Sequence, residues 1–244
     1  MYGDGTGGLA ARGSGTATAK EPAAIAFSDF NGDGHGDVAT ADYNSQDMSV
    51  ALGVNGGDLA SATSIDACGE PSGIAVGRFN ADAFDDLAVS CYGQRWARDR
   101  ARRPETSSCS GTGALPMSAM IPTGSGSMPN AINIGDFNGD SHLDVAAAGF
   151  GNGKCGAALG NGNGSFGPAQ SITVGESPVA IAVGDVDHDG ALDIVLADYL
   201  DSTTIDILHG DGSGGFAMTT VTVGMQPEEV AIADLDGDIV VASA

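Results

Sequence analysis

The sequence predicts an all-β protein, a β-propeller of about five four-stranded blades. Three observations support this fold class: a segment of about twenty residues occurs five times, three of the four intervals between copies are equal, and a glycine-rich segment follows each of the first four copies. Glycine is abundant, at 39 of 244 residues, which favours many turns over long helices. Four short strands within about 49 residues are typical of one propeller blade.

Each unit begins at a proline. The segment PAAIAFSDFNGDGHGDVATA starts at Pro22, and related segments follow at intervals of 49, 58, 49 and 49 residues. Short apolar runs on both sides of an acidic loop indicate strands, and glycine-rich runs such as GNGNGSFGPA indicate the later turns. We therefore divide a single domain, residues 1–244, into blades at about 22–70, 71–128, 129–177, 178–226, and 227–244 together with 1–21.

The two ends of the chain predict the shared fifth blade. Residues 1–21 resemble the outer part of the fourth unit, whereas residues 227–244 resemble the inner part of a unit. Joined, they would close a ring, although most of a third strand has no counterpart. Two alternatives stay open: a fragment of a larger propeller, or an open edge that pairs with another copy and, repeated, builds a filament.

The first acidic loop, DFNGDGHGD from Asp29 to Asp37, places carboxylate or amide oxygens at alternate positions with glycines between them. Calcium takes six to eight oxygen ligands, including backbone carbonyls, whereas magnesium prefers a tighter octahedron. An EF-hand loop begins in the same way, but it needs a glutamate at position 12, where this loop has Thr40. The flanks are strand-like, so the pattern predicts a calcium loop at the tip of a hairpin; a solvated acidic turn is the alternative.

The P-x-x-I-A-x-x-D-F-N-G-D-G-x-x-D and GNGNGSFGPA segments resemble the FG-GAP/VCBS repeat family of integrin-α-like propellers. The resemblance covers nearly the whole chain. It implies that the acidic loop joins the two innermost strands and binds calcium at about three sites. The implied ligands are Asp29, Asn31, Asp33, Asp37 and the backbone carbonyl of His35; Asp136, Asn138, Asp140, Asp144 and the carbonyl of His142; and Asp185, Asp187, Asp189, Asp193 and the carbonyl of Ala191.

Two loops depart from this pattern. In the second, RFNADAFDD, Arg78 takes the first ligand position and Ala81 and Ala83 replace glycines, so we expect no calcium there. We expect the Arg78 guanidinium to pair with Asp82 or Asp86 in place of the ion. The fifth loop, DLDGDIVV, is four residues shorter than its counterpart and too short to encircle an ion, although it keeps Asp234, Asp236 and Asp238.

The charge excludes some partners. The net charge is −23, with 32 acidic and 9 basic residues, so nucleic acid is not expected as a partner. No apolar run is long enough to span a membrane. The first residues lack the pattern of a signal peptide, and two explanations stay open: the peptide has been removed, or the chain is a fragment. Five of the nine basic residues and the only tryptophan, Trp96, fall in the insert at 95–103. This insert is either a solvated loop or a loop that binds a glycan or an anionic partner.

The four cysteines form no CxxC pair. Cys68 and Cys91 flank the predicted inner hairpin of the second blade, so a disulfide between them is feasible and leaves Cys109 with Cys155. Four cysteines allow three pairings, and free buried thiols are the alternative. Disulfides would fit an extracellular setting.

No G-x-S-x-G, HExxH or P-loop motif is present, so we expect no enzyme. The histidines recur in phase with the units, which indicates scaffolding. We predict a secreted or cell-surface calcium-binding propeller for adhesion or assembly, with a protein or glycan partner and self-association. A lectin, or a non-catalytic accessory domain of a larger secreted protein, is the alternative. A lectin should repeat an exposed aromatic in each blade, but Phe166 and Phe216 match leucines in the other units, which indicates core packing.

Overall fold

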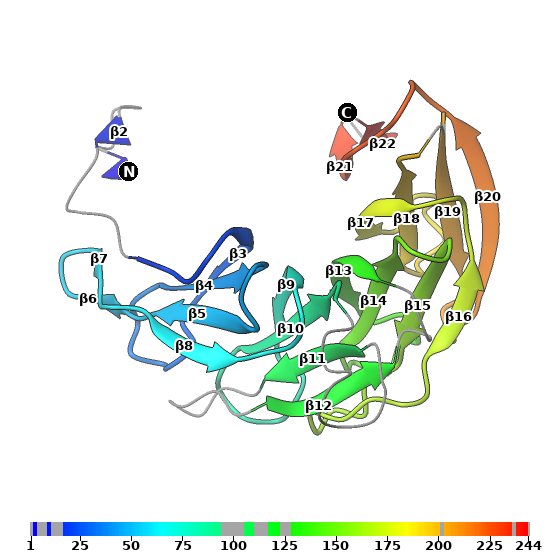
Figure 1. The fold of residues 1–244 in the computed structure, drawn as a ribbon. Coiled ribbons are helices and arrows are strands. Elements are labelled where there is room, and N and C mark those ends of the chain that lie inside the picture. The colour runs from blue at the N-terminus through cyan, green and yellow to red at the C-terminus, as the bar shows by residue number, and fades with distance from the viewer. Residues whose placement is uncertain are drawn as a thin grey trace.

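The computed structural model describes residues 2–3, 9–10, 17–93, 105–109, 117–122, 128–200, 203–235 and 238–243. These residues form strands, and among them no helix is long and apolar enough to cross a membrane. Four four-stranded antiparallel sheets follow one another along an arc (Figure 1). The predicted all-β, propeller-like fold class is confirmed.

Each of the four sheets is one blade, and within a blade the strands lie side by side in chain order. The first blade contains β3 (Pro22–Ser28), β4 (Asp37–Asp42), β5 (Asp47–Ala51) and β8 (Thr63–Asp66), with the small ribbon β6 (Gly53–Val54) and β7 (Asp58–Leu59). The second contains β9 (Pro71–Gly77), β10 (Asp86–Cys91), β11 (Glu105–Cys109) and β12 (Met117–Pro122). The third contains β13 (Pro129–Gly135), β14 (Asp144–Gly149), β15 (Lys154–Ala158) and β16 (Gln170–Thr173). The fourth contains β17 (Pro178–Gly184), β18 (Asp193–Asp198), β19 (Thr204–Gly210) and β20 (Phe216–Thr222).

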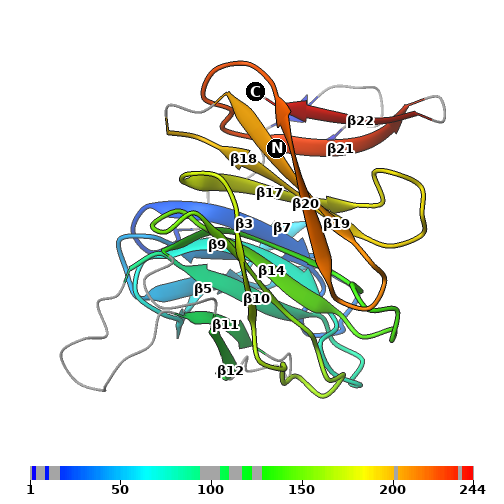
Figure 2. The ribbon, with the colours of Figure 1, turned by 90° about the vertical axis from the view of Figure 1, so that its right-hand side faces the viewer.

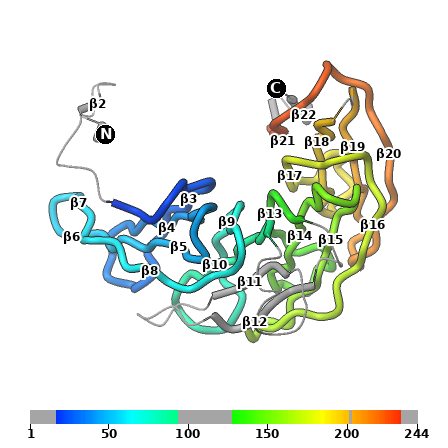
Figure 3. The backbone as a smooth tube through the Cα atoms, in the orientation of Figure 1, coloured from blue at the N-terminus to red at the C-terminus, as the bar shows by residue number. Residues whose placement is uncertain are grey.

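The innermost strand of each blade starts at the proline of the repeat, and these strands line the inner side of the arc (Figure 3). The residue before each proline has a φ between 43° and 57°, although none is a glycine: Glu21, Glu70, Met128, Ser177 and Gln226. In the first four blades its carbonyl accepts the backbone N–H of the residue that follows the second strand, as between Glu21 and Tyr43 at 2.9 Å. This repeated turn closes the end of each inner hairpin that lies away from the acidic loop.

The core lies between the blades. Each apolar cluster draws residues from two neighbouring blades: one joins Phe30 and Met48 of the first blade to Leu87 and Val89 of the second. The other clusters join the second blade to the third, the third to the fourth, and the fourth to β21. Burying a large apolar side chain contributes roughly 1.5–3 kcal/mol, so these seams stabilise the arc as well as each blade.

Beyond the fourth blade, β21 (Val230–Leu235) pairs with β22 (Asp238–Ser243), at the end of the arc (Figure 2). Near the N-terminus, β1 (Tyr2–Gly3) pairs with β2 (Leu9–Ala10). Among the described strands these pairs form two separate two-stranded sheets, so the shared fifth blade stays a prediction. The insert at 95–103 lies outside the described residues.

The disulfide Cys68–Cys91 is present and joins residues separated by 23 positions, as predicted. It ties the segment before β9 to the end of β10. The pairing of Cys155 with Cys109 is wrong, because Cys155 is a free thiol on β15 within the core of the third and fourth blades. Complete burial raises the pKa of Cys155 to about 12, so the thiol is inert at neutral pH.

Candidate metal centre

The acidic loops connect the first strand of each blade to the second. In the first blade the loop runs between β3 and β4, and antiparallel pairing of Ser28 with Asp37 closes it. The same connection recurs in the next three blades. All four loops therefore lie at one end of the inner hairpins, opposite the turns that precede the prolines.

Asp29 holds the first loop in its wrapped shape. Its Oδ1 accepts the backbone N–H groups of Gly32 at 2.7 Å and Asp33 at 3.1 Å, and its Oδ2 accepts that of Gly34 at 2.8 Å. Gly32 and Gly34 have φ values of 73° and 82°, a region that favours glycine. Among the described residues, groups of three acidic or histidine side chains within 4.8 Å of one another occur in the fourth loop and not in this one.

Asn31 and Asp33 continue this pattern. The Oδ1 of Asn31 accepts the N–H of Asp33 at 2.9 Å, and the Oδ1 of Asp33 accepts the N–H of His35 at 2.8 Å. The His35 N–H, together with the Asn31 amide, lowers the pKa of Asp33 below its ordinary value. Asp33 is therefore ionised at neutral pH, as a calcium ligand must be.

The third loop repeats this geometry residue for residue. Asp136 accepts the N–H groups of Gly139 at 2.8 Å, Asp140 at 3.1 Å and Ser141 at 2.8 Å. Ser141 has a φ of 67°, the same conformation that Gly34 adopts in the first loop. The Asn138 amide and then the His142 N–H lower the pKa of Asp140.

The fourth loop gathers three carboxylates. Oxygens of Asp185, Asp187 and Asp189 lie within 4.8 Å of one another. Asp185 again accepts N–H groups from the loop, those of Asp189 at 3.2 Å and Gly190 at 3.0 Å. Three carboxylates held this close repel one another unless a cation or protons neutralise them. This loop therefore fits a divalent cation with oxygen ligands.

The last carboxylate of each loop is buried and has a structural role. Asp144 is fully buried, and its oxygens accept the N–H groups of Phe137 at 2.7 Å and Gly160 at 2.8 Å. Burial raises the pKa of Asp144, although these two N–H groups oppose the shift. Asp37 and Asp193 make the same pair of bonds in their blades. These carboxylates tie the acidic loop to the glycine-rich turn, and ligation of calcium by the same groups stays a prediction.

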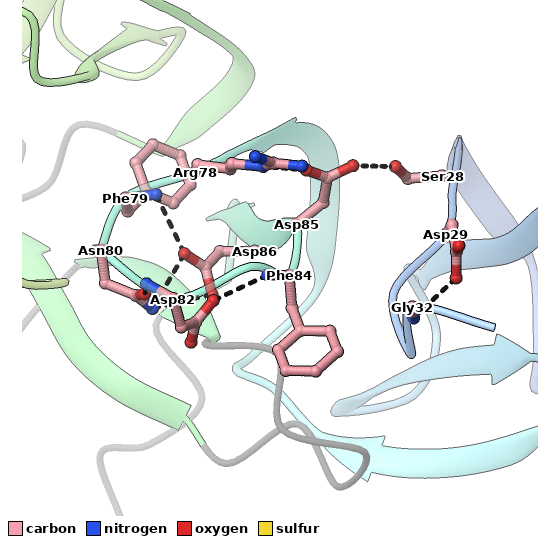
Figure 4. Close-up of polar contacts among 10 residues, drawn as sticks. All are labelled: Ser28, Asp29, Gly32, Arg78, Phe79, Asn80, Asp82, Phe84, Asp85 and Asp86. Atoms are coloured by element: carbon pink, nitrogen blue, oxygen red, sulfur yellow. Dashed lines mark hydrogen bonds and ion pairs between the residues drawn. The ribbon is translucent and has the colours of Figure 1, made fainter. Parts of the chain in front are cut away.

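The second loop differs at its first position (Figure 4). The Nε of Arg78 lies 3.1 Å from Oδ1 of Asp85, and Asp85 also accepts the hydroxyl of Ser28 on β3. The predicted pairing of Arg78 with Asp82 or Asp86 is wrong. The reason is geometric, because both carboxylates are already engaged within their own loop. The arginine therefore contributes to a bridge between the second and first blades.

Those two engaged carboxylates keep part of the common pattern. Asp86 is buried and accepts the N–H of Phe79 at 2.9 Å and the amide of Asn80, while Asp82 accepts the N–H of Phe84 at 2.9 Å. The structural role of the last carboxylate thus survives in a loop that has lost its first ligand position.

The backbone of the second loop is not wrapped in the same way. Ala81 and Ala83, both described, do not have the positive φ of Gly32 and Gly34 at the matching positions. The ring of Phe84 instead packs against the first loop: a Cβ built on Gly32 would lie 2.8 Å from it (Figure 4). This geometry supports the expectation that the second loop binds no calcium.

The fourth blade adds a histidine that sequence reasoning assigned to scaffolding. The Nδ1 of His209 lies 3.2 Å from Oδ2 of Asp187 and 4.0 Å from Oδ1 of Asp193, and its Nε2 lies 2.9 Å from the Thr219 hydroxyl. The sequence feature that could have indicated this role is the position of His209 directly before Gly210, whose backbone N–H donates to Asp193. The fourth loop therefore has a nitrogen group beside its carboxylates.

Fold and loops together define a propeller-like all-β protein with repeated acidic loops. Residues 136–196, which span the third loop and most of the fourth blade's inner hairpin, match the FG-GAP-like repeat family. This bears out the resemblance noted from the sequence. No curated protein matches the chain in sequence.

Solved structures share the fold at low sequence identity. A lectin of Agrocybe aegerita that recognises non-reducing terminal N-acetylglucosamine matches with a TM-score of 0.51 and 18% identity, over 89% of this chain and 56% of its own. The biofilm matrix protein Bap1 of V. cholerae matches with 0.57 and 16%, over 86% and 30%. The periplasmic gluconolactonase PpgL of Pseudomonas aeruginosa matches with 0.62 and 16%, over 91% and 62%. The chain spans less than two thirds of the length of each.

Proposed function

We propose that this chain is a secreted or cell-surface calcium-binding β-propeller that acts in adhesion or assembly, and that it binds rather than catalyses. The observation that carries the calcium assignment is the geometry shared by the first, third and fourth loops. In each, the first aspartate accepts N–H groups of a wrapped backbone, and further carboxylates or amides follow at alternate positions. Calcium would fix these hairpins and offset part of the net charge of −23.

The setting outside the cytoplasm is supported by the Cys68–Cys91 disulfide, because such bonds persist in oxidising compartments. Extracellular calcium sites can be weak, around 10⁻⁴–10⁻³ M, and fill only where calcium is abundant. The likeness to a biofilm matrix protein is consistent with a role in assembly.

Self-association is supported by the exposed face of the first blade. Ile25 and Phe27 on β3 are each 71% exposed. Their counterparts in the second blade, Ile74 and Val76, pack against the core that the first and second blades share. The face of β3 thus resembles a blade seam, and no blade among the described residues packs on it. Another blade, from this chain or from a second copy, would bury it.

Size-exclusion chromatography with light scattering, in millimolar calcium and again in chelator, tests this proposal. We expect calcium to sharpen the elution and raise the melting temperature, with larger species in calcium that Ile25→Ser and Phe27→Ser together abolish. Met225→Ser, which changes a residue that is 85% exposed on the linker after β20, is the matched control. Identical behaviour in calcium and chelator would contradict the calcium assignment, and a strict monomer in calcium would contradict assembly through this face.

A lectin is the second candidate. The expected core packing of Phe166 and Phe216 is confirmed, because their rings lie 5.5 Å from those of Phe79 and Phe137. A different aromatic position nevertheless repeats in every blade, and it favours glycan binding.

A further inference from the structure

An aromatic residue follows the second strand of each of the four blades. The residues are Tyr43, Tyr92, Phe150 and Tyr199, and their spacing of 49, 58 and 49 residues equals that of the repeat. Each donates its backbone N–H to the positive-φ residue that precedes the proline, so all four occupy the same place in their blades. They lie at the end of the inner hairpins opposite the acidic loops.

Three of these side chains form a continuous row. The ring centroids of Tyr43 and Tyr92 are 5.9 Å apart, and those of Tyr92 and Phe150 are 6.0 Å apart. All three rings are only half-buried, in contrast to Phe30 and Phe137 at the acidic-loop end, which are 2% and 1% exposed. Rings that repeat with the blades but stay partly open to solvent are not accounted for by core packing.

These three rings line one pocket of about 620 Å³, within the range of small-ligand sites, about 300–1,000 Å³. The innermost strands β3, β9, β13 and β17, which face the inner side of the arc (Figure 1), supply most of the rest of its wall. The other polar side chains of the lining belong to Ser72, Asn130 and Glu229. The lining combines aromatic and aliphatic side chains with polar groups, and its polar surface exceeds its apolar surface, so the pocket suits a polar organic ligand.

The charge of the pocket restricts the ligand. Glu229 lines it, and Glu70 lies close enough to Tyr43 to contribute, after burial, to raising the pKa of that tyrosine. No lysine, arginine or histidine is among the lining residues in the part of the chain that the structure describes. Phosphates, uronic acids and sialic acids are therefore disfavoured, because each would meet carboxylates without a cation.

We propose that this pocket, lined by Tyr43, Tyr92, Phe150 and Glu229, binds a pyranose glycan that carries no acidic group. The C–H faces of a pyranose pack on aromatic rings, and its hydroxyl groups donate to a carboxylate and to amide oxygens. The inference deepens the binding function proposed above by naming the ligand class and the site. The proposed glycan site lies at the end of the inner hairpins opposite the acidic loops.

Saturation-transfer difference NMR, which detects millimolar binding, tests the inference on the full chain in calcium. The probes are lactose, cellobiose, maltose and diacetylchitobiose, with glucuronic acid as the anionic sugar and spermidine as an organic cation. We expect transfer to the ring protons of at least one neutral disaccharide and none to glucuronic acid. Transfer to none of the four neutral sugars overturns the proposal, and so does saturable binding of spermidine alone, which would assign the pocket to cations.

Two variants locate the binding. Tyr92→Leu and Glu229→Gln should each weaken the affinity for the sugar by about tenfold. Tyr199→Leu, at the equivalent place in the fourth blade but outside the pocket, should leave it unchanged. Glu229 is exposed, so its variant keeps the fold even if loss of a ring does not. Binding that persists in both variants means that the sugar sits elsewhere and overturns the proposal.

The calcium content of the same samples separates the two proposals. If calcium binds but no sugar does, the pocket inference fails alone. If a sugar binds through Tyr92 and Glu229 but no calcium does, the calcium assignment fails alone.

Discussion

The acidic loops of the first and second blades are alike at their last position and differ at their first. Both acidic loops end in a buried aspartate, Asp37 or Asp86, that accepts the N–H of the loop's aromatic residue. They differ at the first position. Asp29 accepts backbone N–H groups of its own loop, whereas Arg78 pairs with Asp85, which also accepts the Ser28 hydroxyl of the first blade. The second blade also carries the disulfide. The comparison separates the buried aspartate, which both loops share, from the first-position aspartate, which only the first loop has.

Removal of the disulfide should have the largest effect. Cys68→Ser with Cys91→Ser frees a loop of 23 residues in sequence, and we expect a loss of about 3 kcal/mol in the free energy of unfolding. The loss should be the same in calcium and in chelator, because we expect the second loop to bind no ion. Chemical denaturation measures it, and dithiothreitol treatment of the unaltered chain is the control. A loss confined to calcium would contradict the division between the blades.

Asp86→Ala should cost nearly as much. The substitution leaves the buried N–H of Phe79 without its acceptor, and we expect a loss of roughly 2–3 kcal/mol in both conditions. Asp37→Ala, the matched variant of the first loop, should lose a similar amount in chelator and more in calcium. If the two variants respond identically to calcium, Asp37 has no part in binding the ion.

Asp29→Ala should remove one calcium ion per chain. We expect a loss of about 1–2 kcal/mol in millimolar calcium, because the ligand no longer stabilises the native state, and a smaller loss in chelator. Direct calcium titration checks the stoichiometry and thermal unfolding checks the stability. An unchanged ion count would show that the first loop is a solvated acidic turn.

The second loop can be converted into the first. Arg78→Asp with Ala81→Gly and Ala83→Gly supplies the missing carboxylate and two residues that adopt positive φ readily, and we expect one additional calcium ion. Arg78→Asp alone should add none, because the alanines do not adopt the wrapped backbone. The gain in stability in calcium should be about 1 kcal/mol. Extra binding by the single variant would show that the first carboxylate suffices.

Arg78→Ala should have the smallest effect. Its side chain is 62% exposed, so the ion pair with Asp85 is screened by solvent and should contribute less than about 1 kcal/mol. The same small loss is expected in calcium and in chelator, measured by chemical denaturation. A loss above 2 kcal/mol would mean that the bridge to Ser28 supports the seam between the blades.

Much of this architecture follows from the repeat. Five copies, separated by 49 residues in three of the four intervals, predict the blades, the inner hairpins and the position of the acidic loops, because each unit must bury its apolar face on the next. Gly32, Gly34, Gly139 and Gly190 also predict where the loops wrap, since each has a positive φ in the structure.

Other features depend on neighbours that the sequence does not reveal. Ser141 and His188 adopt positive φ without being glycines, and at Ser141 the backbone N–H donates to Asp136. The partner of Arg78 is Asp85, because the carboxylates of Asp82 and Asp86 accept N–H groups of their own loop. The acidic loops and glycine-rich turns do not reveal the aromatic row, because Tyr43, Tyr92 and Phe150 follow the second strand of their blades.

The most direct test of the central claim is a calcium count on the unaltered, disulfide-bonded chain by isothermal titration or native mass spectrometry. The geometry predicts three ions per chain, one in each of the loops that begin at Asp29, Asp136 and Asp185. Four ions would show that the Arg78 loop binds as well and that its difference from the first loop is without consequence. No bound calcium at millimolar concentration would contradict the account.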